Sequence, residues 1–450
     1  VVIDQYGEFY PELERNRKAI SDAITREEIR FHRTLETGLT KLENLMERLR
    51  DQGQTQLAGE LAFDLYATYG LPLEITKDIL AENQFTVDEA GFHQAMEEHR
   101  LASGAGEAFG ELGGEDVDVY RQIFEQLTAQ NKLTPEGVKH DPYTQLSVQG
   151  EVLAIVKDGM QVPSAQPGQR VEIVLPQTCF YLESGGQVAD TGWIYSSNGN
   201  PWQIDITDVR KPAAGIVVHI GEVTKGEPKV GDSAIALVDR RRREDIMRNH
   251  TATHLLHRHL RRVLGEHARQ AGSLVAPDRL RFDFTHPEPL TTEQLQAIQD
   301  GVNHDIINDY PLHVEFKPLH KAIEDGAIAL FGEKYAQIVR NVIIGEDETI
   351  SNELCGGTHV EHTGKIGLFL ILSEGSAAAG IRRIEAVTGR KAYEVVANRL
   401  NILSQVADTL SVSPDNVIPR VARLLEELDN AQKQVQALKQ QAVQQEFEQQ

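Results

Sequence analysis

The spacing of apolar residues changes along the chain and divides it into regions. Over residues 1 to about 135, apolar side chains recur at helical intervals among charged neighbours, at Ile20, Ile24, Phe31, Leu35, Leu42, Met46 and Leu49. From about residue 145 to 238 the period is two, as in Trp202, Ile204 and Ile206, and turns such as residues 198–201 separate the short runs. The first pattern predicts a helical bundle. The second predicts strands, which we interpret as a small β-barrel.

The later regions mix the two periods. A helical run precedes a strand-like alternation at residues 280–284, and Thr291 with Gln294 can form a capping box for a helix through Ile298 and Val302. This mixture predicts an α+β sandwich. After residue 415 a heptad pattern predicts a coiled coil or helical hairpin, whose strand number stays open; its positions are Val421, Leu424, Leu428, Ala431, Val435, Leu438 and Ala442.

These patterns together predict a multidomain α+β protein. We expect a helical region at residues 1–140, a β-barrel at 141–239, an α+β core at 240–398, and a helical linker with the start of a coiled coil at 399–450. The chain begins with Val1 and ends at Gln450 inside a helical pattern, so we expect an excised fragment of a longer protein.

Charge and cysteine content restrict the function. The formal net charge of −23 argues against binding polyanions over the whole surface. Arginines nevertheless gather in one stretch: Arg240, Arg241, Arg242, Arg243, Arg248, Arg258, Arg261 and Arg262. A local basic strip on an acidic body can meet RNA on one face, although most such runs are solvated helix surfaces. Two cysteines give no disulfide framework, and no signal peptide or membrane span is evident, so we expect a cytoplasmic protein.

Four side chains form a split set of metal-type ligands. His250 and His254 are four residues apart on a predicted helix and share one face, while Cys355 and His359 flank a Gly-Gly turn. Three imidazoles and a thiolate suit tetrahedral zinc, and isolated surface histidines are the less favoured alternative. A closed set of four protein ligands is usually structural, whereas a hydrolytic zinc keeps a position for water. The sequence leaves both roles open.

Several blocks, in this order, resemble alanyl-tRNA synthetase over nearly the whole chain. Residues 62–70 resemble that family's tRNA-recognising helical region, and residues 180–187 resemble its β-barrel signature. The blocks holding the four ligands resemble its editing centre, and residues 332–335 and 380–386 extend the match. Ala67 and Leu182 depart from the family pattern, but both lie outside the ligand set. No segment resembles the family's adenylating core, so we expect that core to lie before residue 1.

The resemblance implies an aminoacyl-tRNA deacylase that hydrolyses seryl- or glycyl-tRNA(Ala) at a Zn²⁺ site, inside a protein that ligates alanine to tRNA(Ala) with ATP. It also implies a role for Gln270 in the editing pocket, where an amide can donate to or accept from the ester. We expect Arg241, Arg243, Arg248 and Arg382 to contact the tRNA acceptor end. Arg382 could instead pair with Glu374 or Glu385, and Arg281 with Asp283. The missing C-terminal region could form a homodimer.

Two alternatives stay open at this point. A free-standing trans-editing deacylase shares the barrel and zinc core, although the long helical region before residue 140 argues against it. A zinc-stabilised RNA-binding module without catalysis is the alternative from another class, because a metal can serve the fold alone. Deacylation assays separate the two classes.

Overall fold

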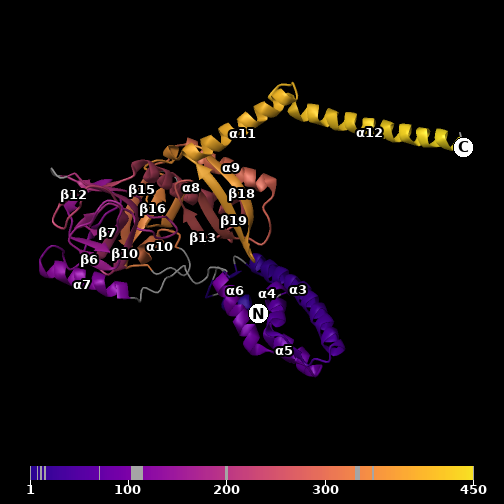
Figure 1. The fold of residues 1–450 in the computed structure, drawn as a ribbon, viewed down its shortest axis with the longest axis horizontal. Coiled ribbons are helices and arrows are strands. Elements are labelled where there is room, and N and C mark those ends of the chain that lie inside the picture. Colours follow the sequence, from indigo (N-terminus) through magenta and orange to yellow (C-terminus); the bar gives the residue numbers. More distant parts are fainter. Residues whose placement is uncertain are drawn as a thin grey trace. The chain divides into compact units, whose positions relative to one another are not determined.

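The structure is a computed structural model that describes residues 2–7, 9–10, 13–14, 17–69, 71–102, 115–197, 201–329, 335–346 and 349–448. Some predictions lie outside the described residues. They concern part of the turn at 198–201, residue 70, and residues 332–334 of one resemblance block. The side chains of Phe31, Leu35 and Ala442 are also outside. The chain forms two compact units, Val1–Leu112 and Gly113–Gln450 (Figure 1). The domain boundaries expected from the sequence stay predictions.

The first unit is helical, as its apolar spacing predicts. Its helices are α1 (Val2–Tyr6), α3 (Arg17–Asp51), α4 (Gly59–Tyr69), α5 (Leu73–Glu82) and α6 (Glu89–Ala102). Leu42, Leu65 and Phe92 from three of these helices are almost fully buried in one core. Two short parallel strands, β1 (Gln56–Leu57) and β2 (Thr86–Val87), join the helices and were not predicted. Helices α4 and α6 approach closely at Gly59, where a Cβ would lie 2.2 Å from the backbone nitrogen of Phe92.

The second unit begins with helix α7 (Glu115–Ala129), which packs on a large antiparallel sheet. The strands in sheet order are β4 (Ser147–Glu151), β12 (Ser233–Val238), β9 (Gly192–Ser196), β10 (Gln203–Ala213), β11 (Ile216–Lys225), β7 (Arg170–Val174), β5 (Ala154–Lys157) and β6 (Met160–Val162). Separately, β3 (Lys139–His140) pairs with β8 (Gln177–Thr178). Buried aliphatic residues such as Ile173, Ile194, Ile204 and Val218 fill the core beside this sheet.

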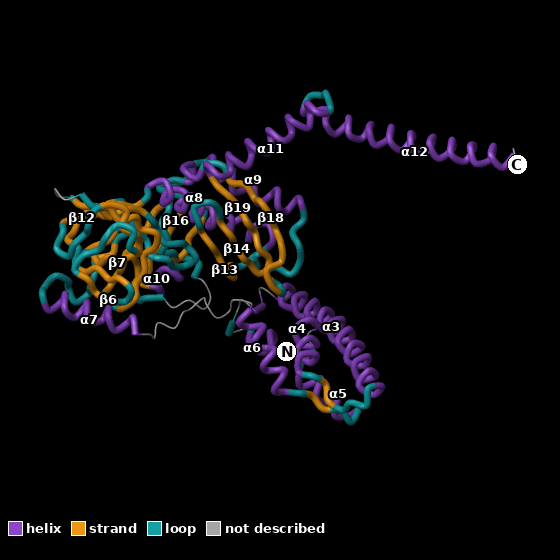
Figure 2. The backbone as a smooth tube through the Cα atoms, viewed as in Figure 1, coloured by secondary structure: helices purple, strands orange, loops and turns teal. Residues whose placement is uncertain are grey.

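The predicted closed barrel is wrong for the described residues. Strands β4 and β6 are the two ends of the sheet order and do not pair with each other. Register shifts, which bend a sheet locally, interrupt the pairing of β10 with β11; the strands are orange in Figure 2. Alternation in the sequence shows that each strand has one buried face, but it does not specify which edges meet.

The rest of the second unit is α+β, as predicted. Strands β13 (Gln270–Val275), β14 (Leu280–Thr285), β19 (Ile381–Thr388) and β18 (Phe369–Ala378) form one sheet in that order. Strands β15 (Leu312–Pro318), β16 (Ile338–Ile344) and β17 (Ser351–Leu354) form another. Helix α8 (Arg240–Leu264) packs on the first sheet and on α9 (Thr292–Ile307), where Thr291 and Gln294 form the predicted capping box. A short helix, α10 (Leu319–Glu324), and a 3-10 turn, η1 (Thr363–Ile366), complete this part.

The C-terminal segment is helical. Helix α11 (Gly389–Thr409) leads through η2 (Pro414–Asn416) into α12 (Val417–Glu448). On α12 the heptad residues Val421, Leu428 and Val435 are 39%, 54% and 51% exposed, so the coiled-coil pairing stays a prediction. Within the described parts of the chain, no helix combines the length and apolar character needed to cross a membrane.

Candidate metal centre

Helix α8 aims two imidazoles in one direction. Its first turn is capped by Asp239, whose carboxylate accepts a hydrogen bond from the backbone nitrogen of Arg242. One helical turn separates His250 from His254, so their rings stack with centroids 5.6 Å apart and an interplanar angle of 4°. Both residues are 6% exposed, because leucines on the same helix pack into the core around them.

The segment after β17 brings a thiol and a third imidazole to this pair. Cys355 Sγ lies 3.3 Å from Nε2 of His250 and 3.3 Å from Nε2 of His359. The approach requires glycine at position 357, because a Cβ there would lie 1.9 Å from Cε1 of His250. One donor atom each from His250, His254, Cys355 and His359 lies within 4.8 Å of the others. The structure therefore brings the four sequence-predicted ligands together.

Each imidazole uses Nδ1 for a contact outside the cluster. Nδ1 of His250 donates to Oε1 of Gln187 at 2.7 Å, and Nδ1 of His254 lies 2.9 Å from Oε2 of Glu353. Nδ1 of His359 bonds the hydroxyl of Thr251 at 3.2 Å. The Nε2 atoms are therefore left for the centre, and Nε2 of His254 is buried without a hydrogen-bond partner among the described residues. Such outer contacts fix the tautomer and orientation of metal-binding histidines, so this donor set fits zinc.

The protonation of the cluster follows from burial and from its internal charges. Burial disfavours the Cys355 thiolate, but the imidazoles of His250 and His359 outweigh it and hold the thiol pKa well below its usual value. Burial lowers the pKa of His359 to about 3, which keeps this imidazole neutral. Burial opposes the charged form of His254, but the Glu353 carboxylate and Cys355 together outweigh burial and raise the pKa of His254 to about 10, so this imidazole would release a proton on binding a metal. A thiolate and a neutral imidazole are the forms that bind metal.

Gln187, Glu353, Thr251 and Arg340 are site residues that the sequence analysis did not identify. Gln187 is fully buried and comes from the loop before β9, and its Nε2 donates to the hydroxyl of Thr358 at 2.9 Å. Arg340 on β16 donates from Nη1 to the carbonyls of Cys355 and Gly357, at 2.8 and 2.9 Å. These contacts join segments that are distant in sequence, so no local pattern signals them.

Gln270 is linked to the cluster indirectly. It begins β13, and its Nε2 donates to the hydroxyl of Ser273 at 3.2 Å. The backbone of Gly186 packs on Ser273, where a Cβ on the glycine would lie 2.5 Å from the serine oxygens. The next residue, Gln187, contacts His250. Among the described residues, Gln270 has no hydrogen bond to the four metal-type ligands, so its role in the pocket stays a prediction.

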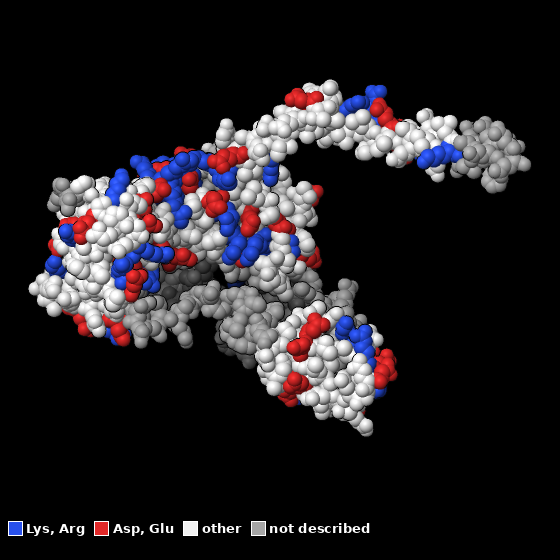
Figure 3. Space-filling view, viewed as in Figure 1, with Lys and Arg blue, Asp and Glu red and all other residues white. Residues whose placement is uncertain are grey.

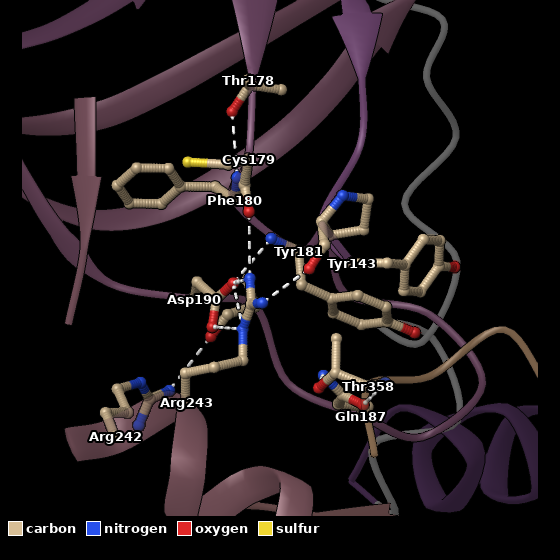
Figure 4. A network of polar contacts seen from close by, with 12 residues as sticks. Tyr143, Thr178, Cys179, Phe180, Tyr181, Gln187, Asp190, Arg242, Arg243 and Thr358 are labelled. Atoms are coloured by element: carbon tan, nitrogen blue, oxygen red, sulfur yellow. Dashed lines mark hydrogen bonds and ion pairs between the residues drawn. The ribbon is translucent and has the colours of Figure 1, made fainter. Parts of the chain in front are cut away.

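The arginines predicted to bind RNA occupy different environments. Arg243 is 3% exposed and forms a buried ion pair with Asp190, and it also donates to the carbonyls of Pro142 and Cys179 (Figure 4). This guanidinium is enclosed by protein, which corrects its assignment to RNA binding. Arg248 donates to Asp245 and to the carbonyl of Lys365.

Arg382 and Arg241 also differ in their exposure to solvent. Arg382 pairs with Glu374 at 2.6 Å, which is one of the two ion pairs that the sequence offered as an alternative to RNA binding. The two side chains are 12% and 7% exposed. Arg241 is exposed. Arg383 donates to Asp283 at 2.7 Å, closer than Arg281 at 3.8 Å. On the face drawn in Figure 3, basic and acidic side chains are interspersed over the second unit.

Comparisons with known proteins agree with the resemblance. Residues 1–242 match the family model described as tRNA synthetases class II (A), and residues 339–385 match the model of the threonyl and alanyl tRNA synthetase second additional domain. The chain is 44% identical over 447 residues to an alanine–tRNA ligase of Chloroflexus aurantiacus, covering 97% of this chain and 48% of the relative. It is 45% identical over 456 residues to that of a Roseiflexus species, covering 97% and 49%. With that of Thermus thermophilus it shares 44% identity over 451 residues, covering 99% and 49%.

The chain thus spans about half the length of the curated relatives it matches. The match of residues 1–242 to the class II model runs against the expectation that the family's adenylating core lies before residue 1, which is corrected accordingly. The cluster of His250, His254, Cys355 and His359 has its second pair inside the match at 339–385. Its geometry, the two family models and the relatives agree that the chain belongs to the alanyl-tRNA synthetase family.

Proposed function

We propose that this chain hydrolyses the ester of tRNA(Ala) mischarged with serine or glycine, as the editing part of an alanine–tRNA ligase. The observation that carries the proposal is the convergence of four donor atoms within 4.8 Å, two of them in the match to the second additional domain. The whole ligase would join alanine to tRNA(Ala) with ATP. An aminoacylation pocket sized for a methyl group cannot exclude glycine and rejects a hydroxyl poorly, so a second site has errors to remove.

The four ligands would hold a zinc ion, and their surroundings suit hydrolysis of an ester. A bound zinc would supply positive charge that polarises a carbonyl or lowers the pKa of a water. Gln187, Glu353 and Thr251 keep the imidazoles oriented, and burial of the three histidines excludes bulk water from their side. The amide of Gln270 is the group that we propose to position the ester or the amino-acid hydroxyl.

Contacts with the tRNA acceptor end would come from the arginines that face solvent. Of the predicted set, Arg241 is exposed and Arg248 is partly exposed, so we assign phosphate contacts to these two. Removing a phosphate contact should weaken tRNA binding and reduce its dependence on salt. An unchanged salt dependence in Arg241→Ala would assign this residue to an ordinary solvated surface.

The test measures metal content and deacylation together. The unaltered protein should bind zinc stoichiometrically and hydrolyse seryl- and glycyl-tRNA(Ala) while sparing alanyl-tRNA(Ala). Cys355→Ala and Gln270→His should each lose seryl-tRNA(Ala) hydrolysis without unfolding, with circular dichroism as the check. The chain's other cysteine, Cys179, is buried away from the donor cluster, so Cys179→Ala is the matched control.

Two outcomes would overturn the proposal. Undiminished hydrolysis by folded Cys355→Ala and Gln270→His would place the chemistry elsewhere. Stoichiometric zinc in a protein that hydrolyses none of the three aminoacyl-tRNAs would favour the alternative, a zinc-stabilised RNA-binding module in which the metal serves the fold alone.

A further inference from the structure

A tyrosine from the segment that precedes the first strand of the large sheet lies against the 355–357 turn of the candidate metal centre. Tyr143 lies between β3 and β4, and its hydroxyl donates to the carbonyl of Gly356 at 2.7 Å. Gly356 directly follows the ligand Cys355. Although its hydroxyl is bonded, Tyr143 is still 45% exposed. An aromatic ring is thus held beside the metal centre with much of its surface accessible.

A guanidinium supports one face of this ring. The Cζ atom of Arg340 lies 4.3 Å from the centroid of the Tyr143 ring, a cation–π distance. Arg340 is itself fixed, because its Nη1 donates to the carbonyls of Cys355 and Gly357. The ring and the guanidinium therefore form a rigid pair attached to the 355–357 turn, and exposure of the ring must come from the face and edge that Arg340 leaves free.

The exposure of the four candidate ligands differs, and this difference indicates the side from which a substrate could reach them. His250, His254 and His359 are 6%, 6% and 8% exposed, whereas Cys355 is partly exposed and Gly356 is exposed. The donor atoms are therefore reached past Cys355 and Gly356, which is the side on which Tyr143 and Arg340 lie. In an aminoacyl-tRNA the ester is on the ribose of the terminal nucleotide. When the ester is at the donor cluster, the terminal base lies one sugar away from it.

We propose that the Tyr143–Arg340 pair is a stacking platform for the terminal adenine of the tRNA. This inference rests on the proposed deacylase function. Bases stack on aromatic side chains through faces that every base has, and an arginine behind the ring adds a favourable charge. The platform would position the ester through the base without reading the base edge. Tyr143 and Arg340 are thus positioning residues for the reaction at the neighbouring donors.

A binding experiment tests the platform without hydrolysis. Uncharged tRNA(Ala) carrying fluorescent 2-aminopurine in place of its terminal adenine is titrated with the full chain, since stacking on tyrosine quenches this base. Quenching is expected with the unaltered protein and with Tyr143→Phe, which keeps the ring, and is expected to be lost with Tyr143→Ala. Tyr393→Ala removes an aromatic residue that is 71% exposed on α11 and serves as the control. Loss of quenching in Tyr143→Phe would assign the residue to anchoring the turn and overturn the platform.

A kinetic experiment separates this inference from the proposed function. For seryl-tRNA(Ala), Tyr143→Ala should raise KM about tenfold with little change in kcat. Stacking of one base on an aromatic side chain contributes enough binding free energy for about a tenfold change in affinity. A seryl-tRNA(Ala) whose terminal nucleotide lacks its base should show the same rise with the unaltered protein and no further rise with Tyr143→Ala. Additive effects of the two changes would overturn the platform while leaving the deacylase function intact. Absence of hydrolysis by the unaltered protein would instead overturn the proposed function.

Discussion

Removing the Gln187 amide should weaken zinc binding although it changes none of the four donors. The side chain is fully buried. Its Oε1 accepts from Nδ1 of His250 at 2.7 Å and from the backbone nitrogen of Thr358 at 2.9 Å, and its Nε2 donates to the Thr358 hydroxyl at 2.9 Å. Gln187→Ala breaks all three bonds and releases the ring of one ligand and the turn that carries two others.

The structure gives the size of the effect. Loss of three buried hydrogen bonds, each contributing about 1 kcal/mol, should lower the free energy of unfolding by about 3 kcal/mol. Loss of an outer contact to a metal ligand typically lowers metal affinity by about 10- to 100-fold. Gln187→Glu keeps an acceptor for His250 and for the Thr358 nitrogen, and the Thr358 hydroxyl can turn to donate, so this variant should retain most of the affinity.

Competition with a chromogenic chelator measures zinc affinity, and urea denaturation measures stability. Gln177→Ala is the matched control, because Gln177 donates a single exposed hydrogen bond to the carbonyl of Gln149. This control should bind zinc as the unaltered protein does. If folded Gln187→Ala also binds zinc as tightly as the unaltered protein, the amide does not organise the metal centre, and the reasoning from its contacts is refuted.

Three further changes test other parts of the second unit. Gly357→Ala would place Cβ 1.9 Å from an imidazole carbon of the cluster and should abolish zinc binding by elemental analysis, whereas Gly356→Ala, with open space around its Cβ, should not. Burial lowers the pKa of His219 to about 4 in the folded protein, compared with about 6.5 in the unfolded chain. The unfolded chain therefore binds a proton first as the pH falls below 6.5, and the free energy of unfolding decreases by up to about 3 kcal/mol towards pH 4. Urea denaturation across this range should show a flatter profile for His219→Gln. Arg243→Met should cost about 3–5 kcal/mol by leaving a buried carboxylate unpaired, and adding Asp190→Leu should recover part of that loss; equal losses in both variants would contradict the ion-pair argument.

Each pair of the candidate metal ligands could be predicted because the spacing within the pair is local. A four-residue interval on one helix aligns His250 with His254, and a glycine turn folds Cys355 towards His359. That the two pairs meet was inferred from their ligand chemistry, since 101 positions separate His254 from Cys355 and no periodicity spans that distance. The Gln187 contact to His250 crosses 63 positions and has no local signal either.

The burial of Arg243 could have been predicted from its position on the helix, but the run of arginines favoured the interpretation as an RNA-binding residue. It lies three residues before Ile246 and seven before His250, which places it on the buried face of α8 rather than on the solvent face. A run of arginines indicates positive charge but does not distinguish the residue that turns inward. The acidic partner, Asp190, comes from the segment before β9, so the pair forms only once the sheet is folded against the helix.

The metal centre combines two regions that the sequence patterns separate at residue 239. Gln187 and Tyr143 come from the side of the large sheet, whereas the four donors come from α8 and the turn after β17. Each imidazole is held by a buried outer contact, so moving any of the three breaks a hydrogen bond, while Cys355 is partly exposed. In the proposed function, a substrate would therefore reach the donors on the Cys355 side, where Tyr143 also lies. Residues 240–398 alone would keep every donor but lose the amide that contacts His250 and the ring beside Gly356, so the strand-rich region contributes side chains to the candidate site.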